Sequence, residues 1–236
     1  MPSVANLGSH PKSCQQRGPG WAASRLAGGF RSDLRVILGT ASLLSVFGLR
    51  VISRLGDRIL TPILPLFVQQ LLPTGSKVAS VTGLIIGASA LTSAIGAIVL
   101  GRTSDRIGAR PVLLFCSFVA AGFYAIQYWV TDATQLLLLQ ALTGFALGGM
   151  LTSLSALLVK LSPEGRQGVV FGLDASAMSI ANFLGPLLGA SIAVGFGLEP
   201  CFLFAAAVFV LTGIAVAKFV PVLGSPPAPI PQRGRD

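Results

Sequence analysis

Long uninterrupted runs of apolar residues dominate the chain and recur along its length. Runs of about 20 residues, the length that a helix needs to cross the hydrocarbon core of a bilayer, appear six times. None shows the strict alternation of a transmembrane β-strand, and in hydrocarbon only helices and closed barrels satisfy their own backbone groups. The pattern predicts six transmembrane helices, within 36–72 and at about 78–100, 111–130, 135–159, 167–194 and 201–221.

Composition supports a membrane protein. Apolar residues make up 53% of the 236 residues and charged residues only 11%, whereas a soluble domain carries about 25% charged residues. The mean hydropathy is +0.78. We therefore predict an all-α membrane protein with a flexible cytoplasmic segment at 1–35, a six-helix bundle at 36–221 and a proline-rich cytoplasmic tail at 222–236.

The net charge of +9 is distributed as membrane topology requires. Basic residues lie in the N-terminal segment and in alternate loops, such as Arg102, Arg106 and Arg110, while the loops "PTGSK", "TDATQ" and "GFGLEP" hold almost none. Because cytoplasmic loops are enriched in Lys and Arg, both termini are expected in the cytoplasm, as a multi-pass protein of the plasma (inner) membrane. No basic patch is interleaved with aromatics, so nucleic acid is not an expected partner.

The residues of common enzyme sites are scarce. His10, the only histidine, and Cys14 lie in the polar N-terminal segment, and Cys116 and Cys201 lie in separate apolar runs. No nucleophile–base pair, phosphate loop or metal-ligand spacing is visible. We expect no enzyme activity, no metal and no cofactor.

Glycines recur at a spacing that favours close helix packing. Lipid supplies no hydrophobic force between helices, so small residues that let backbones approach strengthen their contacts. Four G-x-x-x-G pairs predict a compact bundle: Gly83 and Gly87, Gly144 and Gly148, Gly168 and Gly172, and Gly185 and Gly189.

The segment "GRTSDRIGARPVLL" between the second and third runs resembles the loop signature of the major facilitator superfamily. The matching positions are Gly101, Asp105, Arg106, Gly108 and Arg110, while Ala109 departs from the pattern. A tight cytoplasmic turn would account for the glycines. The resemblance implies that Asp105 and Arg106 hold a cytoplasmic gate.

Two further segments resemble the drug:proton antiporter group of that superfamily. "SPEGRQGVVFGLDASAMSIANFLGPLLGA" is similar to the fifth helix of a half-transporter, with Gly185, Pro186 and Gly189 matching its G-P-x-x-G packing element. "PILPLFVQQL" is similar to the opening helix of a half. Together the resemblance covers about 40–220.

The resemblance implies a transporter with two six-helix halves and a substrate site between them near the midplane. Six helices make one half, which we expect to be the C-terminal one. The expected function is transport of a small molecule by alternating access, with proton-coupled drug efflux as the group's activity. The expected partners are the bilayer, the substrate, and a second six-helix half or a second copy. The alternative is a truncated, non-transporting bundle or an accessory subunit.

The first apolar run contains an unusual set of charges. Arg50, Arg54, Asp57 and Arg58 follow the spacing i, i+4, i+7, i+8 and so share one helix face. Charges facing lipid are costly, so this face meets either the cytoplasmic interface or a polar cavity; we favour the cavity, because 59–72 alone is too short to cross. Asp57 can pair with either neighbouring arginine, and the excess positive charge suggests an anionic group or acidic residues of a missing half.

Other polar residues lie within the predicted spans. Asp174 and Asn182 are eight residues apart and share a face, and an intramembrane carboxylate is a candidate proton carrier. The alternative is that Asp174 lies near the cytoplasmic end and is solvated. Gln140 stands where the family often has an arginine, which weakens the expectation of proton coupling through this half.

Overall fold

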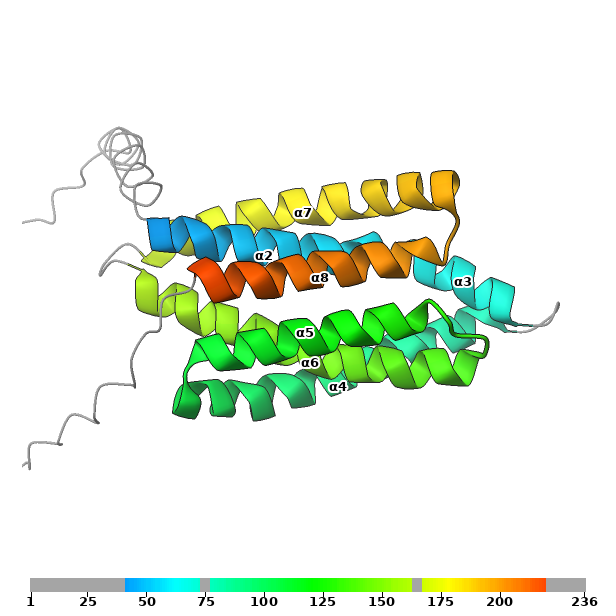
Figure 1. The fold of residues 1–236 in the computed structure, drawn as a ribbon, viewed down its shortest axis with the longest axis horizontal. Coiled ribbons are helices and arrows are strands. Elements are labelled where there is room, and N and C mark those ends of the chain that lie inside the picture. The colour runs from blue at the N-terminus through cyan, green and yellow to red at the C-terminus, as the bar shows by residue number, and fades with distance from the viewer. Residues whose placement is uncertain (1–40, 73–76, 163–166, 220–236) are drawn as a thin grey trace, which may run out of the picture.

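The computed structural model describes residues 41–72, 77–162 and 167–219, and all regular structure in these ranges is helical. The predicted terminal segments at 1–35 and 222–236 lie outside the described residues. The helices, labelled as in Figure 1, are α2 (Ala41–Ile59), α3 (Ile63–Leu71), α4 (Val78–Ile107), α5 (Ala109–Gln127), α6 (Ala133–Leu161), α7 (Gln167–Phe196) and α8 (Pro200–Phe219).

Five helices, α4 to α8, are long and apolar enough to cross a membrane. They confirm the all-helical class and five of the predicted runs. The first predicted run, 36–72, forms two helices in its described part, because the chain turns at 60–62. Pro62 has no N–H to continue the ladder, and the amide of Thr61 bonds instead to the Arg58 carbonyl at 3.2 Å. The crossing predicted for this first run would be formed by α2 and α3, and it remains a prediction.

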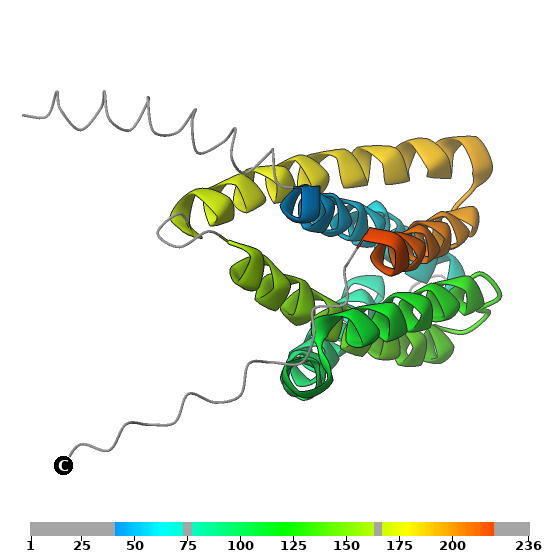
Figure 2. The ribbon, with the colours of Figure 1, turned by 60° about the vertical axis from the view of Figure 1, so that its left-hand side comes forward.

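The helices lie side by side in two groups, α2, α7 and α8 against α4, α5 and α6 (Figure 1 and Figure 2). The contacts follow a repeated plan. α2 packs against α7 and α8, α6 packs in the same way against α4 and α5, and the α5–α8 contact joins the groups. The first three spans and the last three therefore relate as two three-helix repeats, an arrangement found in transporter halves.

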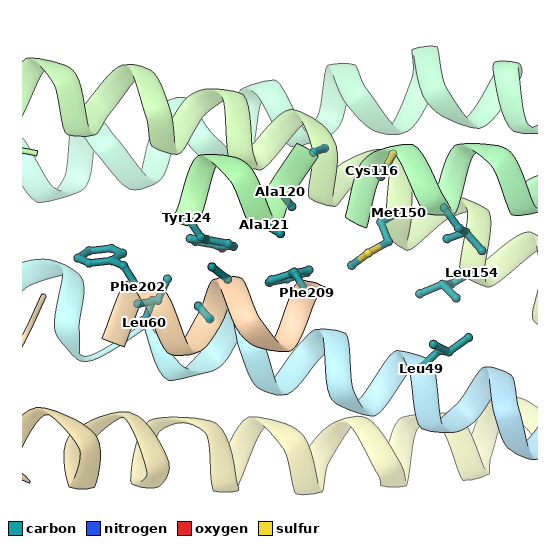
Figure 3. Close-up of a cluster of buried hydrophobic side chains, with 14 of the residues drawn as sticks. Leu49, Leu60, Cys116, Ala120, Ala121, Tyr124, Met150, Leu154, Phe202 and Phe209 are labelled. Atoms are coloured by element: carbon teal, nitrogen blue, oxygen red, sulfur yellow. The ribbon is translucent and has the colours of Figure 1, made fainter. Parts of the chain in front are cut away.

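The interior between α5 and α8 is filled by aromatic and small side chains (Figure 3). Tyr124 stacks on Phe209 with ring centroids 5.3 Å apart, and both side chains are buried. Ala120 and Ala121 lie beside them on α5. Phe67 of α3 meets Phe202 of α8 edge-on at 5.0 Å, which fixes α3 against the bundle after the turn.

Two of the four glycine pairs lie at close helix contacts. A Cβ on Gly144 or Gly148 would collide with Ser89 or Ser93 of α4. In the described part of the chain, nothing lies within 4 Å of such a Cβ on Gly83, Gly87, Gly168 or Gly172, so the expectation that these two pairs pack within the bundle is wrong. They lie in the N-terminal thirds of α4 and α7, the two least buried of the five spanning helices.

Candidate functional site

The charged face of α2 lines a cavity of about 330 Å³. Helices α4, α6 and α7 complete its wall, so the cavity is formed by helices of both repeats. Its lining residues are Arg50, Ser53, Arg54, Asp57, Arg58, Ile86, Ser89, Ala90, Ser93, Gly144, Leu147, Leu151, Leu154 and Met178.

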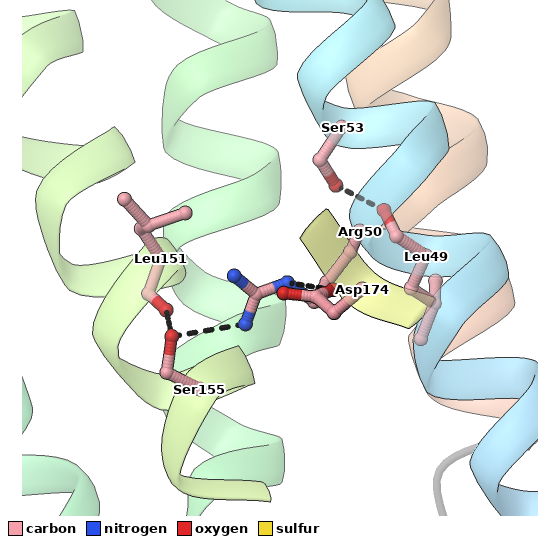
Figure 4. Close-up of polar contacts among 6 residues, drawn as sticks. All are labelled: Leu49, Arg50, Ser53, Leu151, Ser155 and Asp174. Atoms are coloured by element: carbon pink, nitrogen blue, oxygen red, sulfur yellow. Dashed lines mark hydrogen bonds and ion pairs between the residues drawn. The ribbon is translucent and has the colours of Figure 1, made fainter. Parts of the chain in front are cut away.

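Arg50 is tied to two other helices (Figure 4). Its Nε lies 3.0 Å from Oδ1 of Asp174 on α7, and both side chains are 9% exposed. One terminal nitrogen donates to the Ser155 hydroxyl of α6 at 2.9 Å, and that hydroxyl donates to the Leu151 carbonyl. A buried ion pair requires such additional hydrogen bonds to offset its desolvation. The contacts join α2, α6 and α7 at one point.

Asp57 lies between two arginines without a short bond to either. Its Oδ2 is 3.9 Å from Arg54 and 4.0 Å from Arg58. Charge-assisted hydrogen bonds are about 2.7–2.9 Å long, so these are loose pairs. All three side chains are about one-third exposed. The sequence left open whether Asp57 pairs with Arg54 or Arg58, and in the structure it pairs loosely with both.

A second link joins α2 to α7 eight residues further along each helix. Nε of Arg58 donates to Oδ1 of Asn182 at 3.0 Å. This bond and the Arg50–Asp174 pair both join residues 124 positions apart, so the two helices run in the same direction. The shared face predicted for Asp174 and Asn182 is the face that meets the charged face of α2.

The packing element of α7 permits this contact. A Cβ on Gly185 would overlap Arg58, and one on Gly189 would overlap the Ile59 carbonyl. Pro186 lies between them inside the continuous helix. The glycines thus let α7 approach α2 closely enough for the polar bonds to form.

Gln140 does not line the cavity. It lies one turn before Gly144 on the same face of α6, and its Oε1 is buried without a hydrogen-bond partner among the described residues. The alternative in which Asp174 is solvated is wrong, because its carboxylate is buried against Arg50.

The loop-signature residues lie away from the cavity. Gly101 is helical, because α4 continues to Ile107, so a turn explains only Gly108, whose φ is +96°. Asp105 and Arg106 are exposed. Arg110 donates to the Ala217 carbonyl at 2.7 Å, in the last turn of α8. The motif therefore connects the α4–α5 turn to the end of the last helix.

Sequence reasoning missed several residues of the cavity wall. Ala90 and Met178 carry no charge and belong to no motif, so only the helix arrangement places them in the wall. The same holds for Ser155, which bonds to Arg50 outside the lining. The spacing of Arg50 and Arg58 against Asp174 and Asn182 was an available signal, because equal spacing on two helices permits two cross-links. Among the described residues, no group of three His, Cys, Asp or Glu could hold a metal ion.

Comparisons with known proteins match this architecture. The Major Facilitator Superfamily model matches residues 46–235. Multidrug resistance protein MdtG of Klebsiella pneumoniae (strain 342) is 31% identical over 172 residues, which cover 73% of this chain and 42% of that protein. MdtG of Salmonella arizonae is 30% identical over the same share of this chain and 43% of its own length.

A solved structure shows the same fold. The crystal structure of the human organic anion transporter MFSD10 (TETRAN) superposes with a TM-score of 0.66 at 23% identity, covering 77% of this chain and 47% of that one. The chain spans less than half the length of these relatives. With a family match over most of its length and five membrane-length helices in a partial transporter fold, this multi-pass membrane protein belongs to the Major Facilitator Superfamily.

Proposed function

We propose that the chain forms one six-helix half of a secondary transporter that moves a small molecule by alternating access. The observation that carries the proposal is the cavity between α2, α4, α6 and α7, with a charged wall inside an otherwise apolar bundle. Intramembrane charges that face a cavity mark substrate or ion pathways. The relatives named for multidrug resistance support transport of small organic compounds.

The proposed orientation places the α4–α5 turn in the cytoplasm of a plasma (inner) membrane protein. Arg102, Arg106 and Arg110 surround this turn, and Lys160 and Lys218 lie near the ends of α6 and α8 on the same side (Figure 1). Positive residues mark the cytoplasmic side. In this orientation Asp105 and Arg106 stand at the cytoplasmic gate.

Alternating access requires an opposing wall, because one bundle rocks against another around the site. The chain corresponds to 42% of the length of its MdtG relative. We therefore propose that it works with a second six-helix bundle, either the other half of a transporter or a second copy of this half. The competing function is a truncated, non-transporting bundle or an accessory subunit that pairs with another six-helix chain, and it predicts no flux by this chain.

The test is transport by the full chain in vesicles loaded with fluorescein or ethidium, with and without a pH gradient. We expect the dye flux to exceed that of dye-loaded vesicles without the protein. The Arg54→Ala variant in the cavity should reduce this flux several-fold. The control Lys160→Ala removes an exposed charge at the end of α6 and should leave flux unchanged. Crosslinking in the same membranes identifies the pairing. Absent flux despite pairing, or flux unaffected by Arg54→Ala, would contradict the proposal.

A further inference from the structure

We propose that the cavity binds organic anions that have an apolar body, with Arg54 and Arg58 holding the anionic group. This inference rests on the proposed function, since it assigns a ligand class to the cavity of that transporter half. It follows from which guanidiniums already have hydrogen-bond partners, from the net charge around them, and from the lining and volume of the rest of the cavity.

The three cavity arginines differ in how far the protein satisfies them. Arg50 has both Asp174 and Ser155 as close partners, so its role is to hold helices together. Nε of Arg54 is buried and has no hydrogen-bond partner among the residues that the structure describes. The single hydrogen bond described for Arg58 uses Nε. Since a guanidinium has five donors, Arg54 and Arg58 retain donors that a ligand can use.

Asp57 does not satisfy these donors. Its distances of 3.9 and 4.0 Å to the two arginines exceed hydrogen-bonding range, and it is the only acidic side chain among the described lining residues. With Asp174 matched to Arg50, one positive charge is left over on the cavity wall. A cationic ligand would meet one carboxylate flanked by two guanidiniums, whereas an anion would meet two cations held one turn apart.

The rest of the wall is mostly apolar. Ile86 and Ala90 of α4, Leu147 and Leu151 of α6 and Met178 of α7 line it, and Ser89 and Ser93 of α4 are its polar members outside α2. Its volume of about 330 Å³ lies at the small end of the range of about 300–1,000 Å³ found for ligand sites. Methionine adapts to ligands of different shapes. The site therefore fits a compact molecule with a carboxylate at one end and a hydrophobic ring or chain at the other.

The same arginines could instead receive a carboxylate from the second bundle. The shared chemistry is a carboxylate against two guanidiniums, and the isolated chain distinguishes the two sources. A small-molecule site binds a soluble carboxylate without a second bundle. A site built for a protein carboxylate shows no dependence on the apolar body of the probe.

The experiment measures binding of 4-phenylbutyrate, its neutral amide and acetate to the full chain in nanodiscs by titration calorimetry. The variants are Arg54→Gln and Arg58→Gln, with Lys160→Gln as a matched control that removes one exposed charge elsewhere. Reaction of Ala90→Cys with a water-soluble maleimide, in a chain whose Cys14 is replaced by Ser, reports separately that the cavity is open to water. The buried Cys116 and Cys201 are internal controls.

We expect the carboxylate to bind at least about tenfold more tightly than the amide, the factor that one charge-assisted hydrogen bond supplies. Arg54→Gln and Arg58→Gln should each remove most of that preference, and Lys160→Gln should keep it. Equal binding of carboxylate and amide, or a preference that survives both arginine variants, overturns the anion site. If Ala90→Cys is reactive in that case, the transporter proposal still stands. Acetate binding as tightly as 4-phenylbutyrate overturns the small-molecule assignment. An unreactive Ala90→Cys overturns both.

Discussion

At the scale of single residues, the ion pair of Arg50 and Asp174 allows the charged helix α2 to pack inside an apolar bundle. A lone guanidinium in an apolar interior is costly, but the pair is shielded and further bonded to Ser155. The sequence alone indicated that the charged face of α2 must avoid lipid, and it placed Asp174 on a shared face with Asn182. The equal spacing of Arg50 and Arg58 against Asp174 and Asn182 permits the two faces to meet, but the sequence alone could not establish that they do, because helix order does not determine which helices are neighbours.

Removing one member of this pair should strongly destabilise the fold. Arg50→Gln leaves the buried Asp174 carboxylate without its counterion, at an expected cost of about 3–5 kcal/mol. The matched control is Arg54→Gln on the same face, where the pairing is loose and 30% of the side chain is exposed, with an expected cost of at most about 1 kcal/mol. Unfolding of the purified chain in detergent measures both. Equal losses for the two variants would show that the pair has no special role.

Replacing both members by apolar residues gives a further check. Arg50→Met with Asp174→Leu should recover most of the stability lost in Arg50→Gln, because apolar side chains of similar volume can replace a buried ion pair at little cost. The same unfolding measurement applies. A double variant no more stable than Arg50→Gln would contradict the view that the uncompensated charge causes the loss.

At the scale of helices, apolar run length located five spans well, but it did not distinguish packed from open glycines. Gly189 and Gly172 lie in the same helix and have the same spacing motif, yet only Gly189 meets another backbone. The difference depends on where α2 lies beside α7. The break after Ile59 and the extension of α4 to Ile107 were likewise unpredicted. The ends of the predicted runs were placed where charged residues begin, and a helix can continue past that point.

The two glycines allow a controlled test within one helix. Gly189→Ala places a methyl group against the Ile59 carbonyl and should cost about 1–3 kcal/mol through overpacking. Gly172→Ala adds a methyl group where no atom of the described residues lies within 4 Å, and should be neutral or stabilise by up to about 1 kcal/mol. Thermal unfolding in detergent compares them. A tolerated Gly189→Ala would mean that α2 and α7 are further apart than described.

The turn between α4 and α5 should be coupled to the end of α8. Arg110→Ala removes the bond to the Ala217 carbonyl and a positive charge near a helix C-terminus, at an expected local cost of about 1 kcal/mol. Faster hydrogen exchange in the last turn of α8 would report this loss. Arg102→Ala, an exposed arginine before the same turn, is the control, and equal exchange in the two variants would contradict the coupling.

At the scale of the whole molecule, the two three-helix repeats create a cavity that neither repeat contains alone. α2 and α6 are equivalent helices of the two repeats. Each packs against a helix of the other repeat, α2 against α7 and α6 against α4. All four supply cavity residues. Sequence pattern and motif resemblance together predicted the family and the charged wall, but the contribution of α4 to the opposite wall follows only from this repeat arrangement.

The central claim is that the chain crosses the membrane as a transporter half with its basic loops in the cytoplasm. Sided labelling of single cysteines in intact cells tests it most directly, using Ile107→Cys and Thr131→Cys, which lie exposed at opposite ends of α5. The account predicts that an impermeant maleimide added outside reacts with Thr131→Cys and reaches Ile107→Cys only after the membrane is opened. Labelling of Ile107→Cys from outside, or of both positions from one side, would contradict it.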